Sequence, residues 1–228
     1  MGMKPRHRRN SRERDVLLSS KYIRAAADSR KDSLRLAGIE PAPALLEAIT
    51  TFIDLLLRWN RKINLTTITD PAEIVTRNFA ESFHAARWLT AQQGRLIDVG
   101  SGAGFPGLAL KLVLPRWQVV LLEPSRKKSA FLAEAVRTLG LRDVVVESCR
   151  WDESPVPKAS ANAITSRALG GYPDLARWAQ ERLLLGGRLI LWVGARDAAE
   201  LTRMTGWRWD ERPIPETRER VLLVGSRE

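Results

Sequence analysis

The sequence predicts an α/β fold with a mostly parallel, doubly wound sheet and an antiparallel hairpin at its C-terminal end. From residue 95 onward short apolar runs alternate with amphipathic helical patterns, and a glycine-rich turn follows the first run. Strands that alternate with helices favour a parallel sheet with right-handed crossovers. The last two apolar runs have no helix between them, which favours an antiparallel pair.

The first 35 residues are strongly basic and hold few large apolar side chains. They carry eleven Lys and Arg against four Asp and Glu, so most of the net charge of +11 lies here. We expect residues 1–35 to form a flexible N-terminal extension, mostly disordered, with one helix that could form on binding. The positive charge could bind a polyanion such as RNA. Equally, the segment could be a basic extension that is only exposed to solvent.

Residues 36–93 predict a helical part that precedes the sheet. Apolar residues at helical spacing predict one helix over residues 43–60. A second helix is expected to begin at Pro71, which suits the first helical turn, with Asp70 or Thr69 as its cap.

The α/β core is expected over residues 94–228, and together with the helical part it makes residues 36–228 a single domain. Strands are predicted at residues 95–99, 117–123, 144–147, 161–166, 188–193, 207–213 and 220–224. Helices are predicted at residues 108–114, 126–139 and 173–185, with Ser125 as the cap of the second. Gly186 and Gly187 are expected to form a tight turn into the strand at 188–193.

Cysteine and histidine are nearly absent, which argues against a disulfide or a zinc site. The one cysteine, Cys149, lies far in the sequence from both His7 and His84. No apolar run is long enough to span a bilayer, and the basic N-terminus lacks the apolar stretch of a secretory signal. We therefore expect a soluble, cytoplasmic protein without a metal ion.

The glycine-rich turn can be interpreted as a binding site for either of two ligands. Gly102-x-Gly104-x-x-Gly107 matches the dinucleotide fingerprint of NAD enzymes, which is a weak signal when it stands alone. The overlapping Asp98-x-Gly100-x-Gly102-x-Gly104 is the signature of methyltransferases that use S-adenosylmethionine (SAM). A pyrophosphate beside Asp98 would be repelled, whereas the ammonium group of SAM would be attracted, so we favour SAM.

Two further acids follow the next predicted strands. Glu123 closes the second strand 25 residues after Asp98, where a carboxylate can bind both hydroxyls of a ribose. Asp152, beyond the third strand, could accept a hydrogen bond from an adenine amino group. The alternatives are a carboxylate that caps a helix or turn for Asp98, and an ordinary loop acid for Asp152.

Four segments carry a resemblance to a known family. They are Trp59-Asn60-Arg61-Lys62-Ile63-Asn64-Leu65-Thr66, the turn from Asp98 through Phe105-Pro106-Gly107, Ser166-Arg167-Ala168, and Arg218-Glu219-Arg220. Over about residues 43–228 the chain resembles the ribosomal RNA small subunit methyltransferase G family, also called glucose-inhibited division protein B. The resemblance implies a Rossmann-like class I SAM-dependent methyltransferase fold. It also implies methylation of N7 of one guanosine in 16S rRNA, so the expected partner is that RNA or the small-subunit particle.

The resemblance and the turn together define a predicted cofactor site. Its residues are Asp98, Gly100, Gly102, Phe105, Glu123, Pro124, Ser125, Trp151, Asp152 and Arg167. The chain departs from the family in two places. Asn78 and Glu81 stand where the family commonly has His and Asp, and Val193-Gly194 replaces a common Lys-Gly. These departures concern substrate contacts rather than the cofactor site.

The expected chemistry needs no general base, because N7 of guanine already carries an in-plane lone pair. We therefore assign no catalytic residue and expect alignment and charge complementarity to promote the transfer. Lys62, Asn64, Arg77 and Arg167 are predicted to hold the guanosine and its phosphates. The alternative for Lys62 and Arg77 is solvated surface charge, and for Asn64 a turn amide.

Three other functions stay open on the sequence alone. The first is a SAM methyltransferase that acts on another RNA or on a protein. The second is an NAD-binding oxidoreductase or nucleotide sensor, for which the chain offers no acid–base pair. The third is a non-catalytic RNA-binding protein that keeps a nucleotide pocket. A monomer is favoured.

Overall fold

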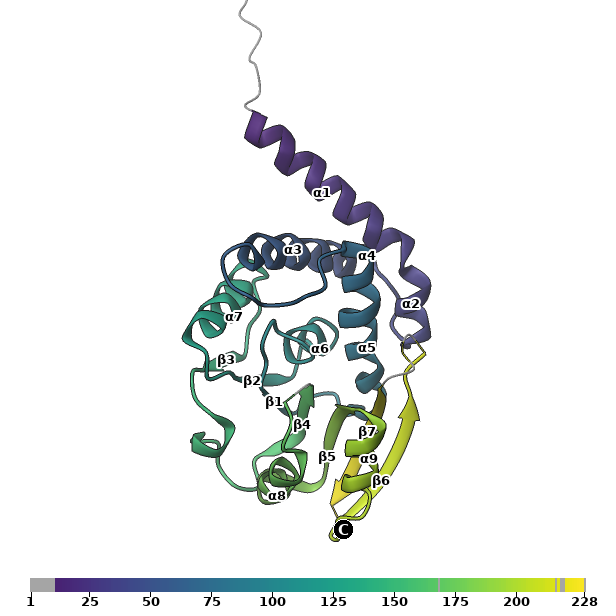
Figure 1. The fold of residues 1–228 in the computed structure, drawn as a ribbon, viewed down its shortest axis with the longest axis vertical. Coiled ribbons are helices and arrows are strands. Elements are labelled where there is room, and N and C mark those ends of the chain that lie inside the picture. Colours follow the sequence, from purple (N-terminus) through teal and green to yellow (C-terminus); the bar gives the residue numbers. More distant parts are fainter. Residues whose placement is uncertain (1–10, 168, 216, 218–219, 228) are drawn as a thin grey trace, which may run out of the picture.

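The computed structural model of the protein describes residues 11–167, 169–215, 217 and 220–227, with side chains from residue 20 onward. Seven strands of these residues form one sheet in the order β3-β2-β1-β4-β5-β7-β6 (Figure 1). Their bounds are β1 (Arg95–Val99), β2 (Gln118–Leu122), β3 (Val144–Glu147), β4 (Ala161–Arg167), β5 (Leu183–Val193), β6 (Trp207–Pro213) and β7 (Val221–Arg227).

The strand directions confirm the predicted sheet. Strand β1 pairs in parallel with β2 and β4, β2 with β3, and β4 with β5. Strand β7 is antiparallel to both of its neighbours, β5 and β6. The C-terminal hairpin therefore folds back, so that β7 lies inside the sheet and β6 forms its edge.

Helices cover both faces of the sheet (Figure 1). One face packs against α3 (Pro43–Asn60), α6 (Gly107–Val113) and α7 (Arg126–Thr138), and the other packs against α8 (Tyr172–Arg182) and α9 (Ala195–Leu201). Side chains of a strand alternate between the two faces. In β1, Leu96 belongs to the first core, whereas Ile97 and Val99 belong to the second.

The second helix of the helical part consists of four joined segments. They are α4 (Pro71–Ile74), the π-helical turn η1 (Val75–Ala80), α5 (Glu81–Phe83) and the 3₁₀ turn η2 (His84–Trp88). Asp70 caps the helix as predicted, because its carboxylate accepts a hydrogen bond from the N–H of Glu73 at 2.8 Å. π-helical turns are often found at functional sites.

The expectation of a mostly disordered N-terminal extension is wrong for residues 11–35, and residues 1–10 lie outside the described part. Helix α1 (Ser11–Ser29) and helix α2 (Lys31–Leu36) occupy this stretch. Ile23, Ala27 and Leu34 are buried in the core that contains α3. These few apolar side chains pack into the core and hold the segment against the domain, although its average composition is polar. The division of the chain at residue 36 stays a prediction.

The predicted end of the third core helix is also wrong. Helix α8 ends at Arg182, and β5 begins at Leu183. The register shifts between Ala161, which pairs with Leu183, and Ala163, which pairs with Arg188. The two glycines expected to form a tight turn, Gly186 and Gly187, therefore form a bulge within β5. Helix α9 has no counterpart among the predicted elements.

Two results bear on location and metal binding. None of the described helices combines the length and the apolar character needed to cross a membrane. Within the described residues, His, Cys, Asp and Glu nowhere gather in a group of three that could hold a metal ion.

Candidate cofactor and substrate site

The glycine-rich turn joins the carboxyl end of β1 to α6. Gly100, Gly102 and Gly104 have φ angles of 72°, 54° and 86°, a region that residues with a side chain rarely adopt. The N–H groups of Gly100 and Ser101 both donate to the carbonyl oxygen of Leu122, at 2.9 and 3.1 Å. The turn is thereby fastened to the end of β2, where the second predicted acid follows.

Asp98 lies beneath the turn and is fully buried. Its Oδ1 accepts a hydrogen bond from the Thr165 hydroxyl at 2.8 Å, and its Oδ2 accepts one from the N–H of Gly107 at 3.1 Å. Burial raises the pKa of Asp98 to about 6, although these hydrogen bonds oppose the rise. Asp98 therefore caps the start of α6, which was the alternative for it. Its predicted contact with an ammonium group stays a prediction.

Glu123 stands directly after β2 and joins the turn to the start of α7. Its Oε2 accepts a hydrogen bond from the N–H of Gly102 at 2.9 Å, and its Oε1 accepts one from the N–H of Ser125, also at 2.9 Å. The Ser125 hydroxyl in turn accepts from the N–H of Lys128 and caps α7, as predicted. Each carboxylate oxygen of Glu123 keeps a second lone pair, so it can still accept from a ribose hydroxyl.

A pocket of about 390 Å³ opens beside these residues. We call it the cofactor pocket, and its lining residues are Gly100, Leu122, Pro124, Arg150, Trp151, Leu169, Gly170, Gly171 and Asp174. It brings together three of the predicted cofactor residues, Gly100, Pro124 and Trp151. Arg150, Leu169 and the Gly170-Gly171 pair were not predicted, although two adjacent glycines three residues after the end of β4 could have indicated a ligand pocket.

Asp152 does not line the cofactor pocket. Its carboxylate accepts two hydrogen bonds from the guanidinium of Arg150, at 3.1 and 3.0 Å. This pairing lowers the pKa of Asp152. The predicted hydrogen bond between Asp152 and an adenine amino group stays a prediction.

Phe105 is a core residue beneath the site. Its ring stacks on Phe52 at a centroid distance of 5.3 Å and meets Phe79 edge-on at 5.0 Å. The guanidinium carbon of Arg167 lies 5.8 Å from its ring centroid. Phe105 therefore supports Arg167 from below, and its predicted contact with the cofactor stays a prediction.

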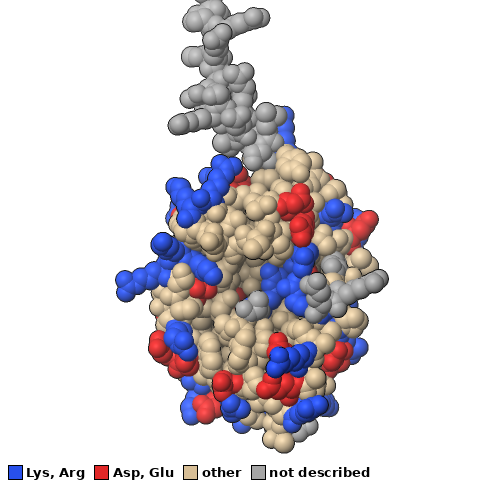
Figure 2. All heavy atoms as spheres, viewed as in Figure 1, with Lys and Arg blue, Asp and Glu red and all other residues tan. Residues whose placement is uncertain are grey.

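A second pocket, of about 670 Å³, lies between the loop at residues 64–68, the π-helical turn and the end of β4. We call it the arginine pocket, and its lining residues are Asn64, Leu65, Thr66, Thr67, Ile68, Arg77, Asn78, Arg167 and Arg220. It brings together three of the four predicted substrate residues, Asn64, Arg77 and Arg167. Figure 2 shows Lys and Arg side chains gathered beside a hollow near the centre of the face drawn.

Lys62, the fourth predicted substrate residue, lies elsewhere. It lines a separate groove with Arg58, Trp59 and Arg61. The separation arises at Asn60, whose Oδ1 accepts hydrogen bonds from the N–H groups of Leu65 and Thr66 at 2.8 and 3.0 Å. This amide closes a loop that carries Asn64 toward the arginine pocket.

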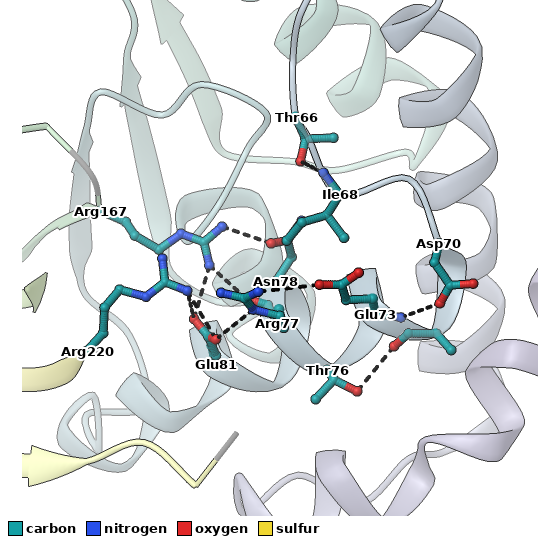
Figure 3. A network of polar contacts seen from close by, with 11 residues as sticks. Thr66, Ile68, Asp70, Glu73, Thr76, Arg77, Asn78, Glu81, Arg167 and Arg220 are labelled. Atoms are coloured by element: carbon teal, nitrogen blue, oxygen red, sulfur yellow. Dashed lines mark hydrogen bonds and ion pairs between the residues drawn. The ribbon is translucent and has the colours of Figure 1, made fainter. Parts of the chain in front are cut away.

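Arg167 occupies the carboxyl end of β4 and points into the helical part. It donates hydrogen bonds to the carbonyl oxygen of Arg77 at 2.9 Å and to Oδ1 of Asn78 at 3.0 Å (Figure 3). Burial lowers the pKa of Arg167 to about 10, so its guanidinium is still charged at neutral pH. Asn78, one of the two departures from the family pattern, thus orients Arg167.

Glu81, the other departure, is fully buried and is shared by three guanidinium groups (Figure 3). Arg220 donates to both of its carboxylate oxygens at 3.2 and 3.0 Å, and Arg167 and Arg77 form ion pairs with it at 3.6 and 3.9 Å. Burial raises the pKa of Glu81, and the three arginines oppose that rise. Ala168, Arg218 and Glu219, which carry part of the resemblance, lie outside the described residues.

The two pockets open at the same edge of the sheet. Val99, the last residue of β1, pairs with Ser166, the neighbour of Arg167. Val193 at the end of β5 pairs with Val221, the neighbour of Arg220. Ligands of open α/β sheets bind at the carboxyl ends of the parallel strands. The arrangement can therefore hold a small cofactor beside a second, anionic ligand.

Solved structures place the fold among SAM-dependent methyltransferases. A SAM-dependent methyltransferase from Aquifex aeolicus superposes with a TM-score of 0.55 at 16% identity, covering 68% of this chain and 92% of that chain. A putative SAM-dependent methyltransferase from Methanococcus maripaludis gives a TM-score of 0.53 at 16% identity, covering 68% and 89%. At this level of identity the likeness concerns the fold, and it confirms the predicted class I methyltransferase architecture.

Sequence relatives identify the family. The family GidB, described as rRNA small subunit methyltransferase G, matches residues 45–206. A ribosomal RNA small subunit methyltransferase G from Roseiflexus castenholzii is 38% identical over 161 residues, covering 69% of this chain and 69% of the relative. The protein of the same name from Roseiflexus sp. (strain RS-1) is 33% identical over 209 residues, covering 86% and 89%. The chain therefore belongs to the ribosomal RNA small subunit methyltransferase G family.

Proposed function

We propose that this protein transfers a methyl group from SAM to N7 of a guanosine in 16S rRNA of the small ribosomal subunit. One observation carries the proposal: the cofactor pocket and the arginine pocket open side by side at the carboxyl ends of β1 and β4. The first suits a nucleoside-like cofactor, and the second carries three arginines suited to RNA phosphates.

SAM is the cofactor of this family and fold. The residues of the cofactor pocket fit it. A Cβ on Gly102 would meet no described atom closer than the carbonyl oxygen of Gly100 at 3.7 Å, so the inside of the turn offers free space. Glu123 offers acceptors for the ribose hydroxyls, and Trp151 and Leu122 offer an apolar wall for the adenine. When bound, SAM supplies an electrophilic methyl group on a positively charged sulfur.

The protein's part in this reaction is to align the two ligands. N7 of guanine can attack without losing a proton, and the described residues that line the two pockets include neither His nor Cys. Arg167 lines the arginine pocket at the end of β4 and is held by Asn78 and by the carbonyl oxygen of Arg77. We assign it the role of fixing the target nucleotide, because a rigid guanidinium lowers the cost of orientation.

The remaining substrate residues have separate tasks in this proposal. Asn64 contacts the target nucleotide from the loop over the arginine pocket, and Arg77 contacts its phosphates. Lys62, in the groove with Arg58 and Arg61, binds a more distant part of the RNA backbone. The protein is proposed to act as a monomer in the cytoplasm, on 16S rRNA or on a small-subunit particle.

The test is methyl transfer from tritiated SAM, with naked 16S rRNA and with assembled small subunits as acceptors. The RNA is then digested to nucleosides and separated by chromatography. We expect tritium in 7-methylguanosine alone. Tritium in another nucleoside, in a ribosomal protein or in neither acceptor would contradict the proposal, and would favour another substrate or a non-catalytic role.

A further inference from the structure

We propose that Arg77, Arg167 and Arg220 form a binding site for one phosphate group of the RNA backbone next to the target nucleotide. The proposal deepens the function above and depends on it only for the identity of the ligand as RNA. Two features of the arginine pocket carry it: an excess of positive charge around Glu81, and a buried donor of Arg220 that makes no hydrogen bond.

Glu81 holds the three guanidinium groups together. Arg77 comes from the π-helical turn, Arg167 from the end of β4, and Arg220 from the start of β7 (Figure 3). Their closest ion-pair distances to the Glu81 carboxylate are 3.9, 3.6 and 3.0 Å. Because the carboxylate is fully buried, each arginine has a fixed partner on its inner side.

The charges in this cluster do not balance. Three guanidinium groups face Glu81, and Arg77 also pairs with Glu73 at 3.4 Å. Three positive charges against two carboxylates leave an excess of one positive charge at the base of the arginine pocket. A cluster of like charges in a concave, partly dry site is costly unless an anion completes it. A phosphate diester brings one negative charge and two free oxygens into hydrogen-bonding range, and arginine is the residue that best matches phosphate.

One buried donor of the cluster has no acceptor nearby. The Nε atoms of Arg77 and Arg220 are buried and make no hydrogen bond to the described residues, but that of Arg77 faces Oε1 of Glu81 at 3.9 Å. Buried donors in native proteins are nearly always paired, so the unbonded Nε of Arg220 in this pocket supports an acceptor supplied by a ligand. The side chains of Arg77 and Arg220 are 35% and 25% exposed, which leaves them accessible from the pocket.

The position of the cluster indicates which phosphate it binds. Arg220 directly precedes Val221, which pairs with Val193 at the carboxyl edge of the sheet. The cluster therefore lies at the edge that also carries the glycine-rich turn. Thr66 and Thr67 line the same pocket and offer hydroxyl groups to the same anion. A phosphate held here would be adjacent to the nucleotide that receives the methyl group.

The salt dependence of RNA binding tests this proposal without any methyl transfer. We compare wild type, Arg220→Gln, Arg77→Gln and Arg116→Gln, using a fragment of 16S rRNA in filter binding between 50 and 200 mM salt. Arg116 is an exposed arginine between α6 and β2, at the opposite edge of the sheet, and serves as the matched control.

Each phosphate contact adds about 0.7–0.9 to the slope of log affinity against log salt. We expect that slope to fall by about one for Arg220→Gln and for Arg77→Gln. Arg116→Gln should keep the wild-type slope. Arg220→Lys preserves the charge and should keep most of the slope. The unfolding temperature of each variant is measured as well, to show that a smaller slope in Arg220→Gln does not come from loss of the folded structure.

A wild-type slope in both pocket variants would overturn the phosphate site. A failure of the phosphate site can be distinguished from a failure of the proposed function. If no methyl group reaches 16S rRNA but the slope falls as expected, the phosphate site stands and the methylation target is wrong. If 7-methylguanosine forms but the slope does not change, the target stands and the arginine cluster binds no phosphate.

Discussion

The N–H of Gly107 donates a hydrogen bond to Oδ2 of Asp98 at 3.1 Å and fastens the first turn of α6 to the end of β1. The other carboxylate oxygen accepts from Thr165 on β4. One buried side chain thereby ties two strands and a helix together beneath the glycine-rich turn. A negative charge at the start of a helix is also favourable for the helix dipole.

Gly107 should tolerate no side chain, because the space around it is already filled. A Cβ there would lie 2.6 Å from Oδ2 of Asp98 and 2.6 Å from Cδ2 of Leu121. We expect Gly107→Ala to lower the free energy of unfolding by about 3 kcal/mol, as overpacking of a core does. Gly140→Ala is the control: its φ is +61° with no atom within 4 Å, so only backbone strain of about 1 kcal/mol is expected. Both free energies of unfolding are measured with denaturant. If Gly107→Ala lowered the free energy of unfolding no more than Gly140→Ala does, the prediction would be wrong.

The buried carboxyl of Asp98 predicts a pH dependence of stability between pH 4 and 6. Its pKa is about 6 in the folded protein, against an ordinary value of 3.8. As the pH rises through this window the unfolded chain ionises first, so the folded state loses stability. Relative to Asp98→Asn, which cannot ionise, wild type should lose about 2 kcal/mol from pH 4 to pH 6, and about 3 kcal/mol over the whole transition. Denaturant unfolding at a series of pH values measures the difference, and a difference that stays constant with pH would refute the prediction.

Helix α2 should contribute to the core through one side chain. Leu34 is completely buried, whereas Leu36 in the same helix is 59% exposed. Leu34→Ala should therefore cost about 2–5 kcal/mol of stability, and the matched Leu36→Ala should cost less than about 0.5 kcal/mol. Thermal unfolding distinguishes them. Equal effects would mean that α2 is a solvated extension after all.

We expect that not even lysine can replace Arg167 without loss of methyl transfer. Its two terminal nitrogens donate to different acceptors, the Arg77 carbonyl and the Asn78 amide, which a single ammonium group cannot reproduce. We expect both Arg167→Ala and Arg167→Lys to lower kcat for methyl transfer by about 100-fold. Arg116→Lys should leave it unchanged. If Arg167→Lys turned over like wild type, positive charge alone would be sufficient at this position.

Local patterns were enough to predict most of the fold. Glycine is the residue that tolerates a positive φ, and Gly100, Gly102 and Gly104 all adopt one in the predicted turn. The alternation of strands and helices along the chain indicated the mostly parallel sheet. The cap residues Asp70 and Ser125 are correct for the same reason, since each bonds an N–H only three residues away.

Contacts between distant parts of the chain could not be predicted. Glu81 and Arg220 are 139 residues apart, and no local pattern links a buried carboxylate to a guanidinium at that separation. The burial of Asp98 depends on Thr165, 67 residues later. Lys62 and Asn64 stand two positions apart in the sequence yet line different pockets. Both lie in the loop that Asn60 closes, and only the fold shows toward which pocket each part of that loop turns.

The most direct test of the central claim is chemical mapping of the methylated position in 16S rRNA. Methylation at N7 makes a guanosine sensitive to borohydride reduction, after which aniline cleaves the strand at that nucleotide. RNA from cells that lack the protein is incubated with SAM and either wild type or Arg167→Ala, then cleaved and read by primer extension. We predict one new cleavage site with wild type and none with Arg167→Ala. Tritium incorporation into the RNA by wild type without any aniline-dependent cleavage would contradict the account.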